Sequence, residues 1–235
     1  MDALEDSFHV YSFYSSSCCQ RIIIAAHLKS IPLTFSYVYL GSREHHADQY
    51  KNVLNPSASV PTLVVTDAHG KKTTIRQSVA ILEYFEERFP DRCPLLPPAS
   101  RPEERALVRD FVGIITNDVQ PVTNSRITRR VKAIRDQLDD QVSFVRDAFV
   151  DGLGAYEALF LQTQEESDVG GFSVGSGITM ADVVLVPAVD QALIYRLDLQ
   201  YAPNVVRIYN HLKQMAAFQA ADWRKQEDTP QRYRQ

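Results

Sequence analysis

Apolar and polar positions along the first 90 residues change repeatedly between the periods of strands and helices. Runs rich in aromatic and β-branched residues indicate strands, and amphipathic stretches between them indicate helices. The pattern predicts strand, helix, strand, short irregular helix, strand, strand and helix at residues 9–14, 17–29, 34–40, 44–53, 62–66, 73–76 and 78–88. Gly70 marks a hairpin turn, and Ser78 is expected to cap the last helix. This order predicts a mixed sheet with an early parallel pair and a later hairpin.

A proline-rich stretch separates this region from the rest of the chain. Residues 90–98 hold four of the twelve prolines, and proline blocks helix continuation and restricts the residue before it. Beyond it the pattern is helical, without convincing strand alternation. Helices are expected at residues 102–118, 124–148, 151–163, 179–193 and 203–217. We therefore expect an α/β domain at 1–90, a linker at 91–98 and an all-α domain at 99–235.

Composition and charge narrow the classes of function. A net charge of -4 without a basic stripe disfavours nucleic acid as a partner. No apolar run reaches the roughly 18 residues that a membrane span needs, and the acidic N-terminus lacks the order of a signal peptide. Three cysteines, an odd number, argue against a disulfide framework and for a reducing compartment. No histidine has metal-ligand spacing, so no metal site is expected. These features favour a cytoplasmic enzyme or binding protein.

The stretch at 14–21, Y-S-S-S-C-C-Q-R, places three serine hydroxyls and two thiols between one apolar run, Val10 to Phe13, and another, Ile22 to Ala26. The explanations are a reactive cysteine, a serine that activates some other thiol, a disulfide, a metal site, or only a polar helix start. For Cys18 and Cys19, two ordinary small side chains, one buried and one at a pocket edge, are commoner than a vicinal disulfide. Cys93 is expected to remain a free thiol.

Three other short motifs have a structural and a functional interpretation. Val60-Pro61 is by frequency an ordinary trans turn, but a cis proline would present the backbone groups of Val60 to an extended peptide. Gln77-Ser78 is a plain helix start, or else its unpaired N–H groups bind a carboxylate. The T-M-A-D motif at 179–182 predicts a capping box with a structural role.

Together these motifs resemble the glutathione transferases. The more specific motifs are similar to the zeta class, whose known activity is maleylacetoacetate isomerase. They are S-S-C with Arg21 at 16–21, N-P-x-x-x-V-P-T-L at 55–63, Q-S-x-A-I-x-E-Y at 77–84, D-V-Q-P-V-T-N at 118–124, V-G-x-x-x-T-M-A-D-x-x-L-V-P at 174–187 and D-T-P at 228–230. The resemblance covers nearly the whole chain. It implies a thioredoxin-like β-α-β-α-β-β-α domain that binds glutathione and an all-helical domain that completes the substrate pocket.

The resemblance also implies roles for single residues. The catalytic hydroxyl would be that of Ser16 or Ser17, with Ser16 the family's usual assignment, and Cys18 matches the motif's cysteine. Val60, beside a cis Pro61, would pair with the cysteinyl backbone of the cofactor, glutathione. The residues expected to bind glutathione are Ser16, Ser17, Cys18, Arg21, His46, Val60, Pro61, Gln77, Ser78, Gln120, Asn124 and Ser125.

The implied chemistry is activation of the glutathione thiol. A serine hydroxyl would donate a hydrogen bond to the thiolate, and the helix start would add positive partial charge. The thiolate would add to the cis double bond of a conjugated keto acid, and the adduct would rotate and expel glutathione as the trans isomer. Small electrophiles would be conjugated instead. The resemblance further implies a homodimer.

Two departures from the zeta pattern bear on this expectation. The chain has S-S-C-C-Q where the family usually has S-S-C-S-W, and Ile194 where an arginine usually meets the substrate's carboxylate. Arg196, two residues on, would lie about 200° around a regular helix from that position. Arg21 and Arg126 are the candidates to replace the missing charge.

Two other functions remain open. A cysteine-type glutathione thiol transferase would use Cys18 or Cys19 to form a mixed disulfide with glutathione. A non-catalytic glutathione-transferase-like protein would use the same fold for ligand storage or assembly.

Overall fold

The computed structural model describes residues 6–163 and 170–234 and divides into two compact units. The first unit combines Met1–Pro94 with Ala216–Gln235, and the second is Leu95–Met215. The observed order of a mixed sheet followed by helices confirms the predicted fold class.

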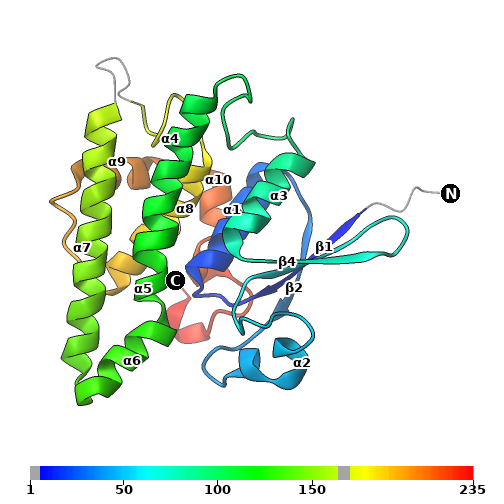
Figure 1. The fold of residues 1–235 in the computed structure, drawn as a ribbon, viewed down its shortest axis with the longest axis horizontal. Helices are drawn as coiled ribbons and strands as arrows, with labels where there is room; N and C mark the ends of the chain where they lie inside the picture. Colours follow the sequence, from blue (N-terminus) through cyan, green and yellow to red (C-terminus); the bar gives the residue numbers. More distant parts are fainter. Residues whose placement is uncertain (1–5, 164–169, 235) are drawn as a thin grey trace. The chain divides into compact units, whose positions relative to one another are not determined.

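A four-stranded mixed sheet forms the centre of the first unit, in the order β2-β1-β3-β4 (Figure 1). Its strands are β1 (Ser7–Ser12), β2 (Leu33–Tyr37), β3 (Thr62–Thr66) and β4 (Lys72–Arg76). β1 runs parallel to β2 and antiparallel to β3, and β3 and β4 form the expected hairpin. Val10 of β1 lies opposite Phe35 on one side and Leu63 on the other. Val10 and Leu63 have no exposed surface, so this register places the apolar alternation in the core.

The helices of the first unit are α1 (Ser17–Leu28), η1 (Glu44–His46), α2 (Asp48–Lys51), α3 (Ser78–Arg88), α10 (Ala216–Ala220), η3 (Trp223–Lys225) and η4 (Gln231–Tyr233). α1 is the central one, because α3 and α10 both pack against it. Its end is held by a buried charge: the Lys29 ammonium lies 2.7 Å from a carboxylate oxygen of Glu86 and donates to backbone carbonyls beyond α3. This contact ties the C-terminal end of α1 to the end of α3.

The second unit is entirely helical over its described residues. It contains α4 (Pro102–Gly113), the π-helical segment η2 (Ile114–Val119), α5 (Gln120–Thr123), α6 (Ser125–Arg135), α7 (Leu138–Thr163), α8 (Met180–Ile194) and α9 (Pro203–Leu212). α8 is buried over most of its length and forms the core. The predicted capping box at its start is present, with Asp182 Oδ2 accepting the Thr179 backbone N–H at 2.7 Å.

The predicted helices at 124–148 and 151–163 do not match the observed boundaries. The expected helix at 124–148 is interrupted at Asp136, whose φ of 53° is left-handed, and α7 then continues through the expected break near 150. Gly152 lies inside α7, where the absence of a side chain leaves room for Val119 of η2. The π-helical turn of η2 was also not predicted.

The boundary of the second domain needs a correction as well. The sequence predicts an all-α domain at 99–235, but residues 216–235 belong to the first unit. The reason is packing: Phe218 and Ala221 are fully buried, and α10 lies against α1. The expected helix at 203–217 accordingly ends at Leu212.

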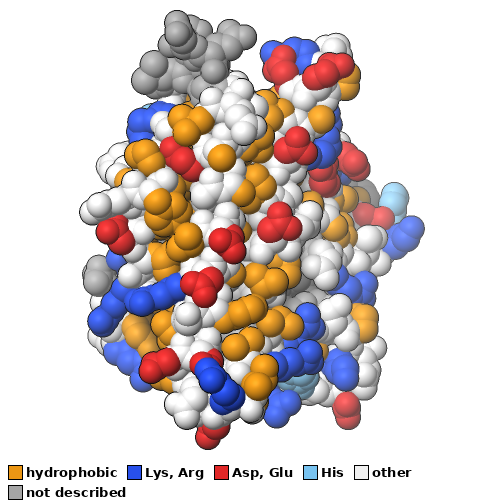
Figure 2. All heavy atoms as spheres, turned by 60° about the vertical axis from the view of Figure 1, so that its left-hand side comes forward, with side chains coloured by type: hydrophobic (Ala, Val, Ile, Leu, Met, Phe, Trp, Pro, Cys, Tyr) orange, Lys and Arg blue, Asp and Glu red, His pale blue; other side chains and the backbone are white. Residues whose placement is uncertain are grey.

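The surface carries no dominant sign of charge on the face in Figure 2, where acidic and basic side chains alternate with apolar ones. Among the described residues, no helix is both long and apolar enough to cross a membrane. A hollow of about 480 Å³ in the second unit is lined by apolar side chains of η2, α5 and α7, together with three aspartates.

Candidate functional site

The serine-rich stretch forms the N-terminal end of α1. Ser16 is the N-cap, with extended backbone, and its Oγ accepts the backbone N–H of Cys19 at 3.3 Å. Its own N–H donates to the carbonyl of Phe13 at 3.0 Å. The Ser16 hydroxyl is therefore held at the first turn, where unpaired N–H groups and the helix dipole favour negative charge. Because a hydroxyl hydrogen rotates about its C–O bond, the capping oxygen can also donate to a bound anion.

The two neighbouring cysteines have different environments. Cys19 is buried, and burial raises the pKa of its thiol to about 12. Cys18 is half-buried, and all three cysteines, including Cys93, are free thiols. No disulfide joins Cys18 and Cys19, as expected. A mechanism that needs the thiolate of Cys19 is disfavoured, because that thiol stays protonated near neutral pH.

The Val60-Pro61 peptide bond is cis, the less frequent of the two alternatives that the sequence allows. Val60 precedes β3, and the described ladders with β1 and β4 both begin at Thr62. The backbone of Val60 thus lies beyond the paired part of the sheet, where an extended ligand can reach it.

A buried polar network holds the segment around Val60. The Tyr50 hydroxyl donates to the Ser59 carbonyl at 2.7 Å and lies 2.9 Å from Thr62 Oγ1. The Asn55 amide donates to the same two groups at 2.8 and 3.0 Å. Burial raises the pKa of Tyr50 to about 12, so the phenol keeps its proton. Sequence reasoning assigned no role to either residue, although Asn55 begins the N-P-x-x-x-V-P-T-L motif at 55–63.

An apolar cluster joins this segment to the start of α1. Cys19, Val38, Tyr50 and Val60 form one buried group, and Phe13 packs against it. The serine turn and the Val60 segment, about 40 residues apart in sequence, are therefore neighbours in the first unit.

The start of α3 is the third part of this arrangement. Gln77 is the N-cap, with a left-handed φ of 74°, and Ser78 is the first helical residue. The prediction that Ser78 caps the helix is therefore wrong, because the break in backbone conformation occurs one residue earlier. The Ser78 hydroxyl instead accepts a hydrogen bond from Arg21 Nη1 at 3.1 Å.

Arg21 is a buried cation beneath the start of α3. It is 1% exposed, and among the described residues neither Nε nor Nη2 has a hydrogen-bond partner. A buried guanidinium normally has an anionic partner. Together with the N–H groups at the start of α3, it makes this end of the helix suitable for a carboxylate.

The remaining predicted residues belong to other elements. His46 is exposed in η1 of the first unit. Gln120 begins α5, Asn124 caps α6 by accepting the Arg126 N–H at 2.9 Å, and Ser125 begins α6, all in the second unit. The first unit therefore brings Ser16, Ser17, Cys18, Arg21, Val60, Pro61, Gln77 and Ser78 around the N-terminal half of α1.

Ile194, which stands where the zeta class usually has an arginine, lies at the end of a helix. Ile194 is the last residue of α8 and is 47% exposed. Arg196 lies outside the helix, with a left-handed φ of 56°. The estimate of 200° around a regular helix therefore does not apply, because the helix ends before Arg196.

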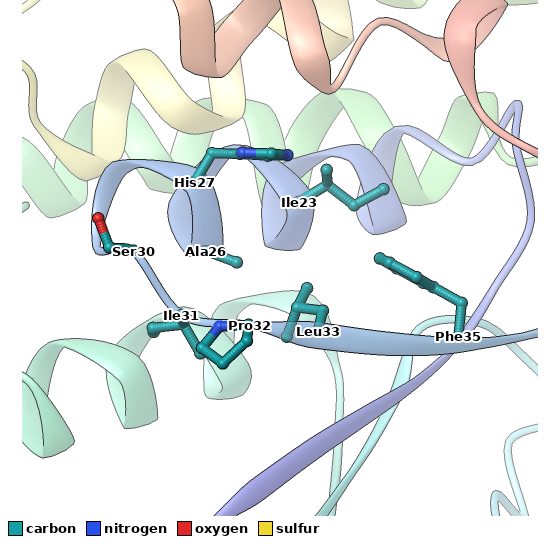
Figure 3. A pocket seen from close by; sticks show the side chains of 8 residues that line it. All are labelled: Ile23, Ala26, His27, Ser30, Ile31, Pro32, Leu33 and Phe35. Atoms are coloured by element: carbon teal, nitrogen blue, oxygen red, sulfur yellow. The ribbon is translucent and has the colours of Figure 1, made fainter.

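A separate pocket of about 590 Å³ lies between the second half of α1 and β2, as Figure 3 shows. Apolar side chains, including Ile23, Leu33 and Phe35, form most of its lining, with His27 and Ser30 at one end. None of the predicted site residues lines it. Among the described residues, no cluster of histidine, cysteine or carboxylate side chains could hold a metal ion.

Comparison with known proteins agrees with this geometry. Residues 15–88 match the glutathione S-transferase N-terminal domain. A probable glutathione S-transferase of Coccidioides immitis is 44% identical over 96% of both chains. The maleylacetoacetate isomerase maiA of Aspergillus fumigatus is 42% identical, over 99% of this chain and 97% of the relative. The chain belongs to the zeta class of the glutathione transferase family.

Two solved structures support the zeta class at the level of the fold. A maleylacetoacetate isomerase from Anaeromyxobacter dehalogenans, with glutathione in its active site, has a TM-score of 0.84 and 30% identity, covering 97% of this chain and 100% of its own. A bacterial zeta-class maleyl pyruvate isomerase has the same TM-score and identity, covering 94% and 100%. The cis Val60-Pro61 bond is the one that the resemblance to the zeta class implied, and the helix start at Gln77-Ser78 was also expected, with the cap one residue later than observed.

Proposed function

We propose that the protein is a glutathione-dependent cis–trans isomerase of maleylacetoacetate-type substrates that also transfers glutathione to small electrophiles. The observation that carries the proposal is the convergence of Ser16, Val60 and Ser78 on the N-terminal half of α1. The maleylacetoacetate isomerase of Aspergillus fumigatus, 42% identical over nearly the whole chain, supports the choice of substrate class.

The residues of the first unit fit glutathione. Gln77 and Ser78, with the start of α3 and the buried charge of Arg21, suit the γ-glutamyl carboxylate. The backbone of Val60 suits the extended cysteinyl residue, and the Tyr50 and Asn55 network holds it in place. His46 is proposed near the glycine end, and Gln120, Asn124 and Ser125 are proposed as the contribution of the second unit.

Ser16 is the proposed activating hydroxyl. A free thiol of this kind has a pKa of roughly 8.5, and each unit by which the site lowers it needs about 1.4 kcal/mol of preferential stabilisation of the anion. The Ser16 hydroxyl donates to the sulfur, and the first turn of α1 adds positive partial charge. Neither group acts as a base, and both stabilise the charged form.

When bound, glutathione supplies the thiolate that adds to the conjugated cis double bond and leaves again after rotation about the resulting single bond. The protein's part is to hold the thiolate at Ser16 and to keep the γ-glutamyl end fixed through Ser78, so that addition and departure occur at one position. Cys18, half-buried in the same turn, is proposed to line the site.

The cysteine-type thiol transferase is the competing function, and Cys18 is its remaining candidate nucleophile. An isomerase assay on a conjugated cis-diketo acid, with and without glutathione, separates the two. We expect conversion only with glutathione, and conversion retained in Cys18→Ala. If Cys18→Ala abolishes conversion, and mass spectrometry after oxidised glutathione finds a mixed disulfide at Cys18, the cysteine-type function is the correct one.

We also propose that the protein forms a homodimer in the cytoplasm. Apolar side chains on α7, among them Phe144 and Val150, are 36% and 42% exposed and would be covered by a second copy. The three free thiols suit a reducing compartment. Sizing at low concentration tests the dimer, and a species of only 26.6 kDa would contradict it.

A further inference from the structure

The C-terminal end of the chain reaches the loop that presents the serines. Residues 222–234, here named the C-terminal strap, follow α10 in the first unit. An oxygen of Asp228, Oδ2, accepts the backbone N–H of Tyr14 at 2.8 Å, a contact between residues 214 positions apart. Tyr14 is two residues before Ser16, between the end of β1 and the start of α1.

Aromatic contacts reinforce this hydrogen bond. The ring of Tyr14 stacks on Tyr233, with centroids 6.2 Å apart and planes 26° from parallel, and lies 6.4 Å from the ring of Trp223. Both partners belong to the strap, on either side of Asp228. The strap therefore contacts both the backbone N–H and the aromatic ring of Tyr14.

The strap itself is braced internally. Thr229 Oγ1 donates to the Trp223 carbonyl at 2.6 Å, and Arg234 donates to the carbonyls of Thr229 and Glu227 at 2.8 and 2.6 Å. These bonds hold the backbone on both sides of Asp228, and they therefore restrict the position of its carboxylate relative to Tyr14.

One oxygen of Asp228 is not used in this contact. Oδ1 is buried and has no hydrogen-bond partner among the described residues. Keeping a buried carboxylate with one unpaired oxygen is costly. A neutral residue that packs equally well would avoid that cost, and the hydrogen bond that this carboxylate does make is the one from the Tyr14 amide to Oδ2.

We propose that Asp228 is a positioning residue for thiol activation. By accepting the hydrogen bond of the Tyr14 amide, it fixes the positions of the Ser16 hydroxyl and of the first turn of α1. The connection from Tyr14 to Ser16 is short, because the backbone N–H of Ser16 donates to the carbonyl of Phe13, the neighbour of Tyr14, at 3.0 Å. This inference rests on the proposed function for its kinetic consequence, whereas the Tyr14 contact is testable without it.

The test compares three variants. Asp228→Leu removes the acceptor, whereas Asp228→Asn keeps a carbonyl oxygen that can accept the same N–H. Glu227→Gln is the matched control, because Glu227 is the next residue of the strap and accepts from the Tyr37 hydroxyl of β2, at 2.9 Å, instead of from Tyr14.

We expect Asp228→Leu to lower kcat about tenfold or more, since small misplacements of a catalytic group have effects of this size. The affinity for glutathione should change little, and the pKa of the bound thiol, followed by thiolate absorbance, should rise. Asp228→Asn and Glu227→Gln should remain close to the native enzyme. A folded Asp228→Leu protein with native kcat and native thiol pKa overturns the proposal, as does an Asn variant that is as impaired as the Leu variant.

Hydrogen exchange at the Tyr14 amide gives a readout that needs neither activity nor a folded Leu variant. The native protein and Asp228→Asn should protect this amide, and a native Tyr14 amide that exchanges as fast as an open loop overturns the proposal. A native protein that protects Tyr14 but neither binds glutathione nor isomerises the substrate would contradict the proposed function while leaving the Asp228 contact intact.

Discussion

At the start of α1, a single hydroxyl oxygen serves both a helix and a proposed ligand. Ser16 Oγ accepts the Cys19 N–H, which fixes its place, and its rotatable hydrogen is the proposed donor to the thiolate. Ser17, the first residue of the helix, has no such capping bond, and this difference favours Ser16 between the two serines.

Ser16→Ala is expected to lower glutathione-dependent kcat by about 10²-fold, by analogy with the loss of one donor to a developing anion. The affinity for glutathione should fall far less, because the hydroxyl acts on the charged sulfur. Loss of the cap should also lower the free energy of unfolding by about 1 kcal/mol. Steady-state kinetics and glutathione titration measure the two effects.

Ser17→Ala is the matched control for this change. It should affect kcat less than Ser16→Ala and should leave the cap intact. A larger loss of kcat in Ser17→Ala, or equal losses of turnover and binding in Ser16→Ala, would be incompatible with the assigned role.

Cys19 should be chemically inert in the folded protein. Burial raises the pKa of its thiol to about 12, so at about pH 8 the reactive thiolate is scarce, and the sulfur is also covered. Raising the pH towards 12 would increase the thiolate fraction, since a thiol loses its proton as the pH passes its pKa. Alkylation followed by mass spectrometry should modify Cys18 first and Cys19 only after unfolding. Equal labelling of both in the folded protein would contradict this environment.

Ile194→Arg tests the departure from the zeta pattern. Ile194 is 47% exposed at the last residue of α8, so a longer charged side chain can be accommodated. A charge-assisted hydrogen bond to the substrate's carboxylate contributes about 1.5–3 kcal/mol, which predicts a KM for maleylacetoacetate about tenfold lower. Turnover of a neutral electrophile should not improve. An unchanged KM in the folded variant would mean that another cation already meets the carboxylate.

The elements of the first unit were the most predictable part of the chain. The predicted strand at 62–66 and helix at 78–88 match β3 and α3, because a proline, a hairpin turn and a break at Gln77 delimit them locally. The residues that hold the site were less predictable. The hydrogen bonds of Asn55 and Tyr50 depend on tertiary neighbours, which no local pattern describes.

The error in α7 shows the limit of local rules. The sequence pattern predicted a break between the helices at 124–148 and 151–163, yet α7 is continuous there, with η2 packed against it, although Gly152 and Gly154 lower its helix propensity. A Cβ at Gly152 would overlap with Val119 Cγ2, whereas a Cβ at Gly154 would meet nothing within 4 Å.

This difference gives a paired prediction for the helix. Gly152→Ala should lower the free energy of unfolding by about 1–3 kcal/mol through overpacking against η2. Gly154→Ala should raise it by up to about 1 kcal/mol, because alanine is the better helix former. Urea denaturation measures both values. Similar stabilities of the two variants would mean that Val119 does not pack at Gly152 as described.

Over the whole chain, the second domain boundary could not be read from the sequence. The prolines of 90–98 mark the point where the chain passes from the first unit to the second. Nothing in the composition marks residue 216, where the chain enters the first unit again. Residues 216–235 belong to the first unit because of contacts between residues distant in sequence, such as those of α10 with α1 and of Asp228 with Tyr14. The D-T-P motif at 228–230 indicated the family, but its local pattern could not reveal this contact.

The central claim is that the enzyme uses glutathione as a returned cofactor, activated at Ser16. The most direct measurement is the conversion of maleylacetoacetate with far less glutathione than substrate, with product and glutathione both quantified. We predict many molecules of trans product per glutathione, free glutathione recovered unchanged at the end, and no conversion above background in its absence. Conversion that stops after one product per glutathione, or that proceeds equally well without glutathione, would contradict the account.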